Sequence, residues 1–375
     1  MERDSVVNPY EVKGNIDYEE IAKRFGVNLI DEALKERIKR LAGGELHFMI
    51  RRGIYYAQRD MNWLLDEYEK GNKFYLYTGI GPSGTMTLGH LIPFALTQWF
   101  QEKFDAEVYI QIPDEEKFLV KKKSDLTLEK THELAYDDVA NIIAMGFKKG
   151  KTKIFLDTEY AKTLYKNAVR VSRGITFSMI KDAFGFTVED NIGKIFYTSM
   201  QAVPAFLMSV EKGKNIPCLI PLAIDQDVHF RIARDSIAKL GYYKPASIQS
   251  KFLPGLSGKP KMSASDPSDT LYLNDDDETV RKKVFKAFTG QQPTAELQKK
   301  HGGNPEICTV CQYYRFFFED DDTRLKKIFD AERSGSILAG EHKQDLYERI
   351  TKYLAGQRQK KEKALERMDD FIVRD

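Results

Sequence analysis

The most informative segment for the fold is Tyr77-Thr78-Gly79-Ile80-Gly81-Pro82-Ser83-Gly84-Thr85-Met86-Thr87-Leu88-Gly89-His90. A β-rich run, 74–77, leads into its glycine-rich turn, and a helical apolar pattern follows from residue 91 to residue 104. A strand, a glycine turn and a helix in this order are typical of a parallel α/β sheet, which binds ligands at the carboxyl ends of its strands. We expect an anionic ligand at this turn, because the free amide groups and the dipole of the helix attract anions.

The second informative segment lies far along the chain and reads Lys259-Pro260-Lys261-Met262-Ser263-Ala264-Ser265-Asp266. It has two lysines and two serines and lacks the apolar rhythm of a core segment. Ammonium and hydroxyl groups donate hydrogen bonds, so a loop of this composition is suited to hold a polyphosphate. Together the two segments predict an ATP site.

Strands and helices alternate around the glycine turn, and this alternation ends near residue 275. Further β-rich runs occur at 108–112, 154–156 and 218–222. Helical patterns occur at 18–70, 127–145, 227–240, 278–288, 308–318, 323–332 and 344–374. We predict an α/β fold with a Rossmann-like parallel sheet as the catalytic domain at 71–274. A mainly helical N-terminal extension at 1–70 precedes it, and an all-α domain at 275–375 follows it.

Composition favours a globular chain with ample core. The 375 residues have a formal net charge of +2, with 42% apolar and 30% charged residues. No run of about 18 or more uncharged apolar residues occurs, and the segment after Met1 lacks the apolar region of a secretory signal. We expect a cytoplasmic protein without a membrane partner. A nucleic acid would have to meet one of two basic patches, 35–40 with Arg51 and Arg52, or 358–363, each also explained as a solvated helix face.

Three cysteines, Cys218, Cys308 and Cys311, are too few for a disulfide framework. The last two have the Cys-x-x-Cys spacing of half a zinc site or of a redox pair. A closed zinc site needs four ligands, and only His301 nearby and the distant Cys218 are candidates. We therefore expect no metal site and interpret the pair as small helix residues. The acidic run 319–322 also has metal-binding chemistry, but acidic residues before a helix usually compensate its dipole.

The segment 79–84 also matches GxGxxG, the dinucleotide-binding pattern. Pro82 counts against that interpretation, because it removes a backbone donor from the turn. The acidic partner that the pattern requires lies about 20 residues further on, whereas the first acidic group after the next strand is Asp114. A kinase-type phosphate loop is excluded, since no Gly-Lys-Ser/Thr follows the glycines. An NAD-dependent oxidoreductase is therefore only a distant hypothesis.

Two motifs resemble the signatures of class I aminoacyl-tRNA synthetases: Gly89-His90 after a Gly-Pro-Ser turn, and Lys261-Met262-Ser263-Ala264-Ser265. The resemblance narrows to the archaeal and eukaryotic tryptophanyl-tRNA synthetase family. The similarity runs from about residue 8 through the helical end of the chain. It includes the segments 51–54, 74–79, 89–94, 223–227, 261–267 and 316–322. Ala264 stands where many class I enzymes have a second lysine, as is usual in the tryptophan enzymes.

The resemblance implies a tryptophan–tRNA ligase that uses ATP with Mg²⁺ and no tightly bound cofactor. In this family the carboxylate of L-tryptophan attacks the α-phosphorus of ATP, and the 3′-terminal ribose of tRNA(Trp) then takes the acyl group from tryptophanyl-adenylate. The residues implied in catalysis are Lys261, Ser263, Ser265, His90 and Thr87. Those implied in ATP binding are Gly79, Gly81, Pro82, Ser83, Gly89, His90, Lys259, Lys261, Met262 and Ser263.

The resemblance also implies an amino-acid pocket. Its residues are Tyr77 and Gln111 at the indole nitrogen, Glu116, Gln201 and Gln226 at the ammonium and carboxylate, Tyr197 and Phe230 as walls, and Gly79. An indole N–H only donates, so its partner has to present an acceptor oxygen. Family members are homodimers, and we expect the apolar residues 91–99 to contribute to the interface. The helical end, 275–375, is expected to bind the anticodon.

Two departures from the family pattern bear on turnover. Ile80 stands where members generally have arginine, and Thr87 replaces the first histidine of His-x-Gly-His. Thr87 donates one hydrogen bond but carries no charge. Two further hypotheses therefore stay open: a catalytically weak tRNA-binding paralogue, and the tyrosine-specific sister enzyme. Gln111 discriminates against the latter, because a phenol donor is expected to meet an acidic residue there.

Overall fold

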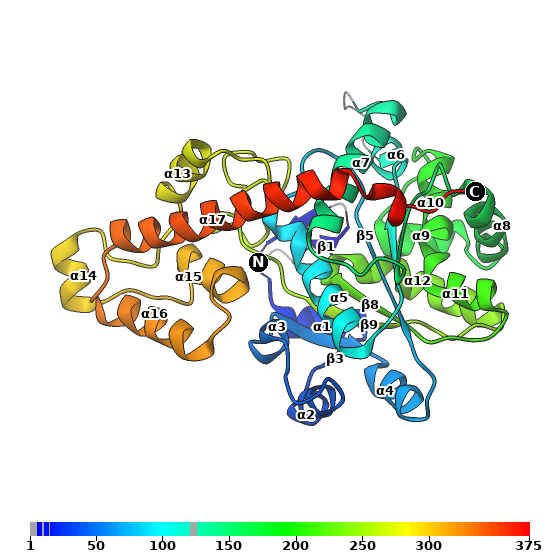
Figure 1. The fold of residues 1–375 in the computed structure, drawn as a ribbon, viewed down its shortest axis with the longest axis horizontal. Helices are drawn as coiled ribbons and strands as arrows, with labels where there is room; N and C mark the ends of the chain where they lie inside the picture. Colours follow the sequence, from blue (N-terminus) through cyan, green and yellow to red (C-terminus); the bar gives the residue numbers. More distant parts are fainter. Residues whose placement is uncertain (1–5, 10, 15, 121–125) are drawn as a thin grey trace.

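A seven-stranded sheet forms the centre of the molecule (Figure 1). The structure is a computed structural model that describes residues 6–9, 11–14, 16–120 and 126–375. The strands, in their order across the sheet, are β3 (Asn28–Leu29), β4 (Tyr55–Arg59), β9 (Ala246–Ser250), β8 (Cys218–Ala223), β5 (Tyr75–Gly79), β6 (Val108–Ile112) and β7 (Thr152–Leu156). The last five of these run parallel, and β4 and β3 add an antiparallel edge beside β9. Strands β1 (Val6–Asn8) and β2 (Glu11–Lys13) form a separate antiparallel pair.

The winding of the sheet reverses at β5. The chain continues from β5 through β6 to β7 on one side, and later places β8 and β9 on the other side. At the reversal Tyr75 pairs with Cys218 and Leu76 with Leu219. A parallel sheet of this kind binds its ligand outside the carboxyl ends of the strands, where the winding reverses. The topology therefore points to the ends of β5 and β8.

Helices cover both faces of the sheet, because successive strand residues point to opposite sides. In β5, Tyr75 and Tyr77 lie in one apolar cluster, and Leu76 lies in the other. The helices that supply the cluster around the two tyrosines are α8 (Ala161–Ser172), α11 (Pro204–Lys212) and α12 (Asp227–Lys239). Those on the opposite face include α5 (Leu91–Phe104) and α7 (Leu128–Ala144). Burial on both faces explains why these strands are continuous apolar runs in the sequence.

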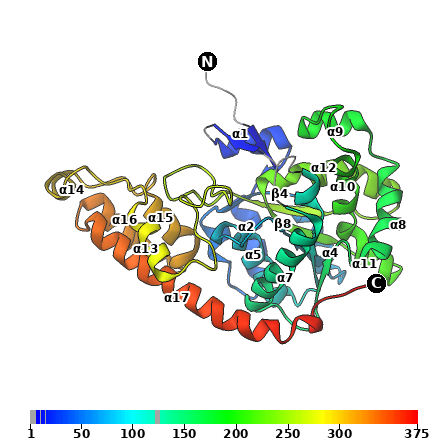
Figure 2. The ribbon, with the colours of Figure 1, turned by 90° about the horizontal axis from the view of Figure 1, so that it is seen from above.

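The chain after β9 is helical, as predicted. Its helices are α13 (Asp277–Phe285), α14 (Ala295–His301), α15 (Thr309–Tyr313), α16 (Asp322–Ser334) and α17 (Ala339–Leu365), with a π-helical turn at Tyr314–Phe318. In Figures 1 and 2, α13 to α16 gather at one end of the molecule, and α17 runs from them back to α7 beside the sheet. Among the described residues, no helix is both long and apolar enough to cross a membrane.

The predicted strands and helices are present, but the sequence did not predict β9 within the sheet. Two further differences concern the ends of the chain. The N-terminal region has the expected helices, α1 (Tyr18–Phe25), α2 (Glu32–Leu41), α3 (Phe48–Arg51) and α4 (Met61–Glu69), but β3 and β4 also join the main sheet. At the other end the last helix stops at Leu365 and not at residue 374. The chain turns there so that Ile372 pairs with Ile154 of β7, which places the C-terminus beside the sheet.

The N-terminal basic patch is largely neutralised within the chain. Arg51 Nε and Arg52 Nε lie 2.9 and 2.7 Å from the Asp322 carboxylate. In α2, Arg37 pairs with Glu69. Asp321 caps α16 by accepting a hydrogen bond from the next turn, which confirms the interpretation of the acidic run as part of a helix start. The basic side chains of this patch therefore pair with acidic residues of the same chain and do not form a free binding surface.

The apolar residues of α5 between Leu91 and Trp99 are mostly buried in the core of the chain itself, because this helix packs on β5 and β8. Their part in a dimer interface stays a prediction. The expectation for the cysteine pair needs correction. The cysteine pair is not isolated from other metal-ligand side chains. Glu332 and His342, and not His301 or Cys218, gather around Cys308 and Cys311.

Candidate active site

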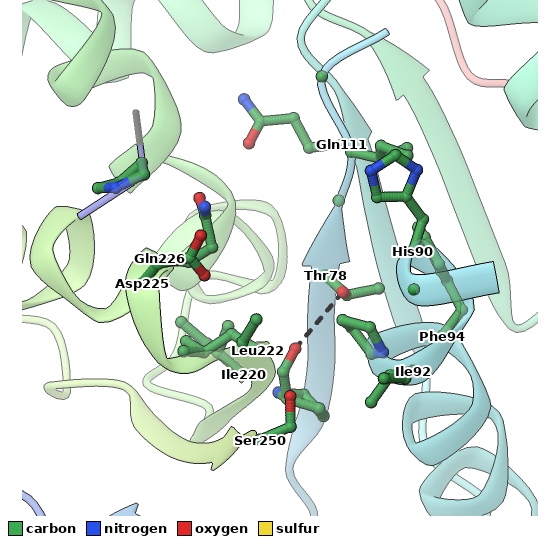
Figure 3. A pocket seen from close by; sticks show the side chains of 18 of the residues that line it. Thr78, His90, Ile92, Phe94, Gln111, Ile220, Leu222, Asp225, Gln226 and Ser250 are labelled. Atoms are coloured by element: carbon green, nitrogen blue, oxygen red, sulfur yellow. Dashed lines mark hydrogen bonds between the residues drawn. The ribbon is translucent and has the colours of Figure 1, made fainter. Parts of the chain in front are cut away.

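A pocket opens where the winding of the sheet reverses (Figure 3). Its wall is built from the carboxyl ends of β5, β6, β8 and β9, together with the first turn of α5. Figure 3 shows Thr78 of β5 between His90 and Phe94 on one side and Leu222, Asp225 and Gln226 on the other. The cavity volume is about 270 Å³, near the lower end of the roughly 300–1,000 Å³ typical of small-molecule sites.

Close backbone approach requires the glycines of the turn. A side chain at Gly79 would place its Cβ 2.5 Å from the backbone oxygen of Gln111 on β6. A side chain at Gly81 would overlap the carboxylate of Glu116. Both glycines therefore let the turn lie directly on β6 and on α6 (Glu116–Val120), which keeps the floor of the pocket open for a ligand.

His90 lies at the start of α5 and is neutral. Its Nδ1 accepts a hydrogen bond from the backbone N–H of Thr87 at 3.2 Å, so the ring proton is on Nε2. Burial and, to a smaller extent, the nearby Lys261 and Lys117 together lower the pKa of His90 to about 4. His90 can therefore donate one hydrogen bond to a ligand oxygen, but it adds no positive charge near neutral pH. The segment of Thr87 is held by a bridge to Tyr272, just after the lysine–serine loop.

The lysine–serine loop meets the pocket through Lys261 and Met262. Lys261 Nζ lies 2.5 Å from Asp225 Oδ2 and 4.9 Å from the Phe252 ring centroid. Met262 is buried and lies in van der Waals range of Gly89. Of the residues expected at ATP or in catalysis, the pocket wall includes Gly79, Gly81, Ser83, Thr87, Gly89, His90, Lys261 and Met262. Those that do not line it are Pro82, Lys259, Ser263 and Ser265.

Three of these four residues belong to the lysine–serine loop and have partners within it, whereas Pro82 lies in the glycine turn. Lys259 Nζ is 2.6 Å from Asp266 Oδ2, and Ser263 Oγ and Ser265 Oγ are 2.8 Å apart. These contacts hold the loop away from the cavity except at Lys261 and Met262. Contact between a ligand and Lys259, Ser263 or Ser265 would therefore require the loop to move.

All eight residues expected to bind tryptophan line the pocket. At its inner end the hydroxyl of Tyr77 donates to Gln111 Oε1 at 2.5 Å. The amide nitrogen of Gln111 donates to both carboxylate oxygens of Asp157, at 3.0 and 2.8 Å. Asp157 thereby fixes the amide, so that the Gln111 oxygen and not its NH₂ group faces Tyr77. Burial raises the pKa of Asp157, and the hydrogen bond from Gln111 opposes that rise.

The opposite part of the pocket is polar and acidic. Glu116 is buried, and its Oε1 lies 2.8 Å from Lys117 Nζ. Gln201 Oε1 is buried, and no described residue hydrogen-bonds to it. The residues that enclose this part are Tyr197, on the same face of α10 (Ile192–Ala202) as Gln201, and Phe230, whose ring meets the Tyr77 ring edge-on at 5.6 Å. An acceptor oxygen, a carboxylate and aromatic walls suit an amino acid with a ring.

The sequence motifs did not single out four charged or aromatic residues of the wall. They are Asp225, Lys117, Lys251 and Phe252. Asp225 belongs to the segment 223–227 that resembles the family, which was its only signal. Lys251 directly follows β9 and Lys117 lies in α6, and lysines at such positions are too common to be recognised from one sequence.

Comparison with known proteins agrees with this geometry. The family described as "tRNA synthetases class I (W and Y)" matches residues 69–355. The chain belongs to this family. It is 46% identical over 373 residues to a protein named tryptophan--tRNA ligase from Sulfolobus acidocaldarius, covering 99% of this chain and 96% of the relative. The protein of that name from Pyrococcus furiosus is 45% identical, with 99% and 94% covered.

Solved synthetase structures have the same fold. The tryptophanyl-tRNA synthetase of Plasmodium falciparum superposes with a TM-score of 0.87 at 36% identity, covering 94% of this chain and 97% of that one. The tryptophanyl-tRNA synthetase of Encephalitozoon cuniculi bound to tryptophan gives a TM-score of 0.84 at 33% identity, with 96% and 100% covered. The class I synthetase fold extends through the C-terminal helices, and this chain is a member of the tryptophanyl-tRNA synthetase family.

Proposed function

We propose that the chain is a tryptophan–tRNA ligase. It activates L-tryptophan with ATP and transfers the tryptophanyl group to the 3′ end of tRNA(Trp). The observation that supports this most directly is the Tyr77–Gln111–Asp157 chain at the inner end of the pocket. An indole N–H needs an acceptor, and Gln111 presents an oxygen whose orientation is fixed from behind.

The first step needs positioning and charge stabilisation. The carboxylate oxygen of tryptophan attacks the α-phosphorus of ATP, a new O–P bond forms, and pyrophosphate leaves. Negative charge increases on the phosphates, and the protein stabilises it with preorganised donors. We assign this role to Lys261, to the Nε2–H of His90 and to Ser263 and Ser265 after the loop closes. Mg²⁺ enters as the counter-ion of the ATP substrate.

Lys117 compensates for the absence of arginine at Ile80. Its Cε lies 3.2 Å from the position that a Cβ of Gly81 would occupy, so the ammonium group stands beside the glycine turn. Glu116, which Lys117 contacts, holds the ammonium of tryptophan, with Gln201 Oε1 as a second acceptor. In the second step the 3′-terminal ribose oxygen attacks the activated carbonyl carbon, and AMP leaves.

The tyrosine-specific alternative fits the pocket less well. Both oxygens of the nearest buried carboxylate, Asp157, already accept hydrogen bonds from Gln111. A phenol would therefore meet an amide oxygen and not a carboxylate. Phenylalanine has no donor at this position and would be rejected more strongly, because a site built around a hydrogen-bonding group discriminates by about 10⁴-fold against a ligand that lacks it.

The test is exchange of pyrophosphate into ATP with each standard amino acid. We expect exchange with tryptophan alone. Equal exchange with tyrosine would overturn the specificity, and absence of exchange with every amino acid while tRNA(Trp) still binds would favour the catalytically weak paralogue.

We also propose that the protein is a homodimer that uses the surface of residues 165–192. The large apolar side chains exposed on this surface are Tyr165 (60%), Val169 (45%), Phe177 (38%), Val188 (83%) and Ile192 (84%). Such a concentration of exposed apolar groups is typical of an interface. Light scattering of the wild type and of Val188→Lys/Ile192→Lys tests this. A dimeric wild type and a monomeric variant are expected, and a dimeric variant would exclude this surface.

The division of the chain at residues 70 and 274 is likewise a proposal, with 275–375 as the part that binds the anticodon. The helical composition of this part and the position of α13 to α16 at one end of the molecule support it (Figure 2). Variants that shorten exposed basic side chains on α16, such as Lys326→Ala/Lys327→Ala, should raise the KM for tRNA(Trp) and leave pyrophosphate exchange unchanged.

A further inference from the structure

Three C-terminal helices bring four side chains with metal-ligand chemistry together. Cys308 precedes α15, Cys311 lies in α15, Glu332 lies near the end of α16, and His342 lies in the first turn of α17. One ligand atom from each lies within 4.8 Å of the others. All four residues are buried, with exposed fractions of 0, 0, 0 and 1%. Acidic groups often gather on a surface, but a buried cluster with two sulfur atoms is unusual.

Hydrogen bonds within the chain do not satisfy this cluster. Glu332 Oε2 accepts from the Gln291 side chain at 2.7 Å and lies 3.0 Å from His342 Nδ1. Glu332 Oε1 and His342 Nε2 are buried, and no described residue hydrogen-bonds to either of them. Buried polar atoms normally have a partner, because an unsatisfied one destabilises the folded chain. Two such atoms beside two thiols indicate that a bound species completes the cluster.

We propose that Cys308, Cys311, Glu332 and His342 form a structural site for a zinc ion. Zinc takes thiolate, imidazole and carboxylate ligands, and four protein ligands close its tetrahedral shell, as in other structural sites. Tetrahedral coordination at about 2.0–2.3 Å places ligand atoms roughly 3.3–3.8 Å apart. The ion would thus draw the four groups together by only about an ångström.

The ligand set also selects the kind of metal. Two thiolates and an imidazole suit zinc, whereas magnesium and calcium prefer oxygen ligands. The contact between Glu332 Oε2 and His342 Nδ1 resembles the carboxylate–histidine contacts that orient metal-binding imidazoles. The ring of Tyr314 stacks on His342, with centroids 5.3 Å apart, and so restricts the imidazole as well.

Zinc at this site would join three helices that the chain connects only through loops. None of the four ligands lines the pocket at the sheet, so the site is structural and separate from the chemistry proposed above. A metal bound only by the folded chain stabilises it. Removal of zinc should therefore lower the thermal stability of the helical end and leave tryptophan-dependent pyrophosphate exchange nearly unchanged.

Metal content is the primary test. The full chain, without a histidine tag, is produced in zinc-supplemented medium, dialysed and measured by mass spectrometry for metals. We expect about one zinc ion per chain in the wild type and in Cys218→Ala, a matched control at the remaining buried cysteine. We expect substoichiometric zinc in Cys308→Ser/Cys311→Ser and in His342→Gln.

Cobalt supplies a readout that needs no variant. Co²⁺ added to the zinc-free wild type should give a thiolate-to-cobalt charge-transfer band and the strong visible bands of tetrahedral coordination. Glu332→Gln should retain the charge-transfer band but change the visible bands. A wild type that takes up no zinc and gives no thiolate band would overturn the proposal. A Cys308–Cys311 disulfide in protein isolated from a reducing cytoplasm would also overturn it, in favour of a redox pair.

Discussion

Lys261 and Asp225 form an ion pair across the mouth of the pocket, with Nζ 2.5 Å from Oδ2. Asp225 is buried, and its other oxygen has no hydrogen-bond partner among the described residues. The lysine thus has two competing partners, the carboxylate and the phosphates of ATP. Because it already points into the pocket, binding of ATP requires only a change of partner and a short movement of the loop.

Replacement of Lys261 should separate activity from tryptophan binding. In Lys261→Ala, pyrophosphate exchange should fall by about 10²-fold or more, because a preorganised donor to the phosphates is lost. The affinity for tryptophan, measured by calorimetry, should change little. The variant should also be less stable by roughly 1–3 kcal/mol, since the buried Asp225 carboxylate loses its partner.

The double variant Lys261→Ala/Asp225→Asn is the matched control. It should recover most of the lost stability in urea unfolding without recovering exchange activity. Recovery of activity would show that the carboxylate left unpaired, and not the missing ammonium group, had caused the loss.

The rate of pyrophosphate exchange should not follow the titration of His90 near neutral pH. Its pKa is lowered to about 4, so the neutral ring persists as the pH falls from about 8 to about 5. His90→Gln keeps a neutral donor, and it should lose less activity than His90→Ala. The measurement is log kcat/KM for ATP against pH, in which wild type and His90→Gln should run parallel. An inflection near pH 6.5 in the wild type alone would contradict a neutral His90.

Gln111 should control affinity for the indole ring. Gln111→Ala removes the acceptor proposed for the indole N–H, so kcat/KM for tryptophan should fall by roughly 10–100-fold, the equivalent of one hydrogen bond to a buried group. The KM for ATP should stay within about two-fold, because the lysine–serine loop is untouched. Asp157→Asn tests whether the Asp157 carboxylate holds the Gln111 amide in its orientation. It allows the Gln111 amide to rotate, and it should weaken tryptophan binding less than Gln111→Ala does.

Local patterns in the sequence predicted the parts of this molecule that depend on local physics. The strand ending at Gly79 and the helix from Leu91 follow from apolar periodicity and glycine chemistry, and the resemblance supplied the pocket residues. Contacts between segments that are distant along the chain could not be predicted from these local patterns. Glu332 and His342 come from helices well after Cys311, so spacing alone could not join them. Strands β4 and β9 were missed because residues 55–59 and 246–250 are buried almost throughout and show no alternation.

Asp138 marks an unsatisfied position where α7 packs against α17. It is fully buried, and no described residue hydrogen-bonds to either carboxylate oxygen. Burial raises its pKa well above the ordinary value, with a further rise from Asp137 and a partial offset by Lys361. The folded chain therefore holds Asp138 protonated at pH values where the unfolded chain, with a pKa of about 3.9, does not. Proton binding by Asp138 in the folded chain contributes to stability. This contribution is complete below about pH 3.9 and is lost as the pH rises towards the pKa that Asp138 has in the folded chain.

Asp138→Asn should therefore stabilise the protein increasingly as the pH rises. The variant cannot ionise, so its urea midpoint should equal that of the wild type near pH 4 and exceed it progressively up to about pH 8. Asp137→Asn is the neighbouring control, because Asp137 is only half-buried and pairs with Lys361. Its midpoint should be unchanged or slightly lower at each pH, since it loses a surface ion pair worth at most about 1 kcal/mol. A constant offset between Asp138→Asn and wild type at all pH values would mean that Asp138 has the same pKa in the folded and unfolded chain.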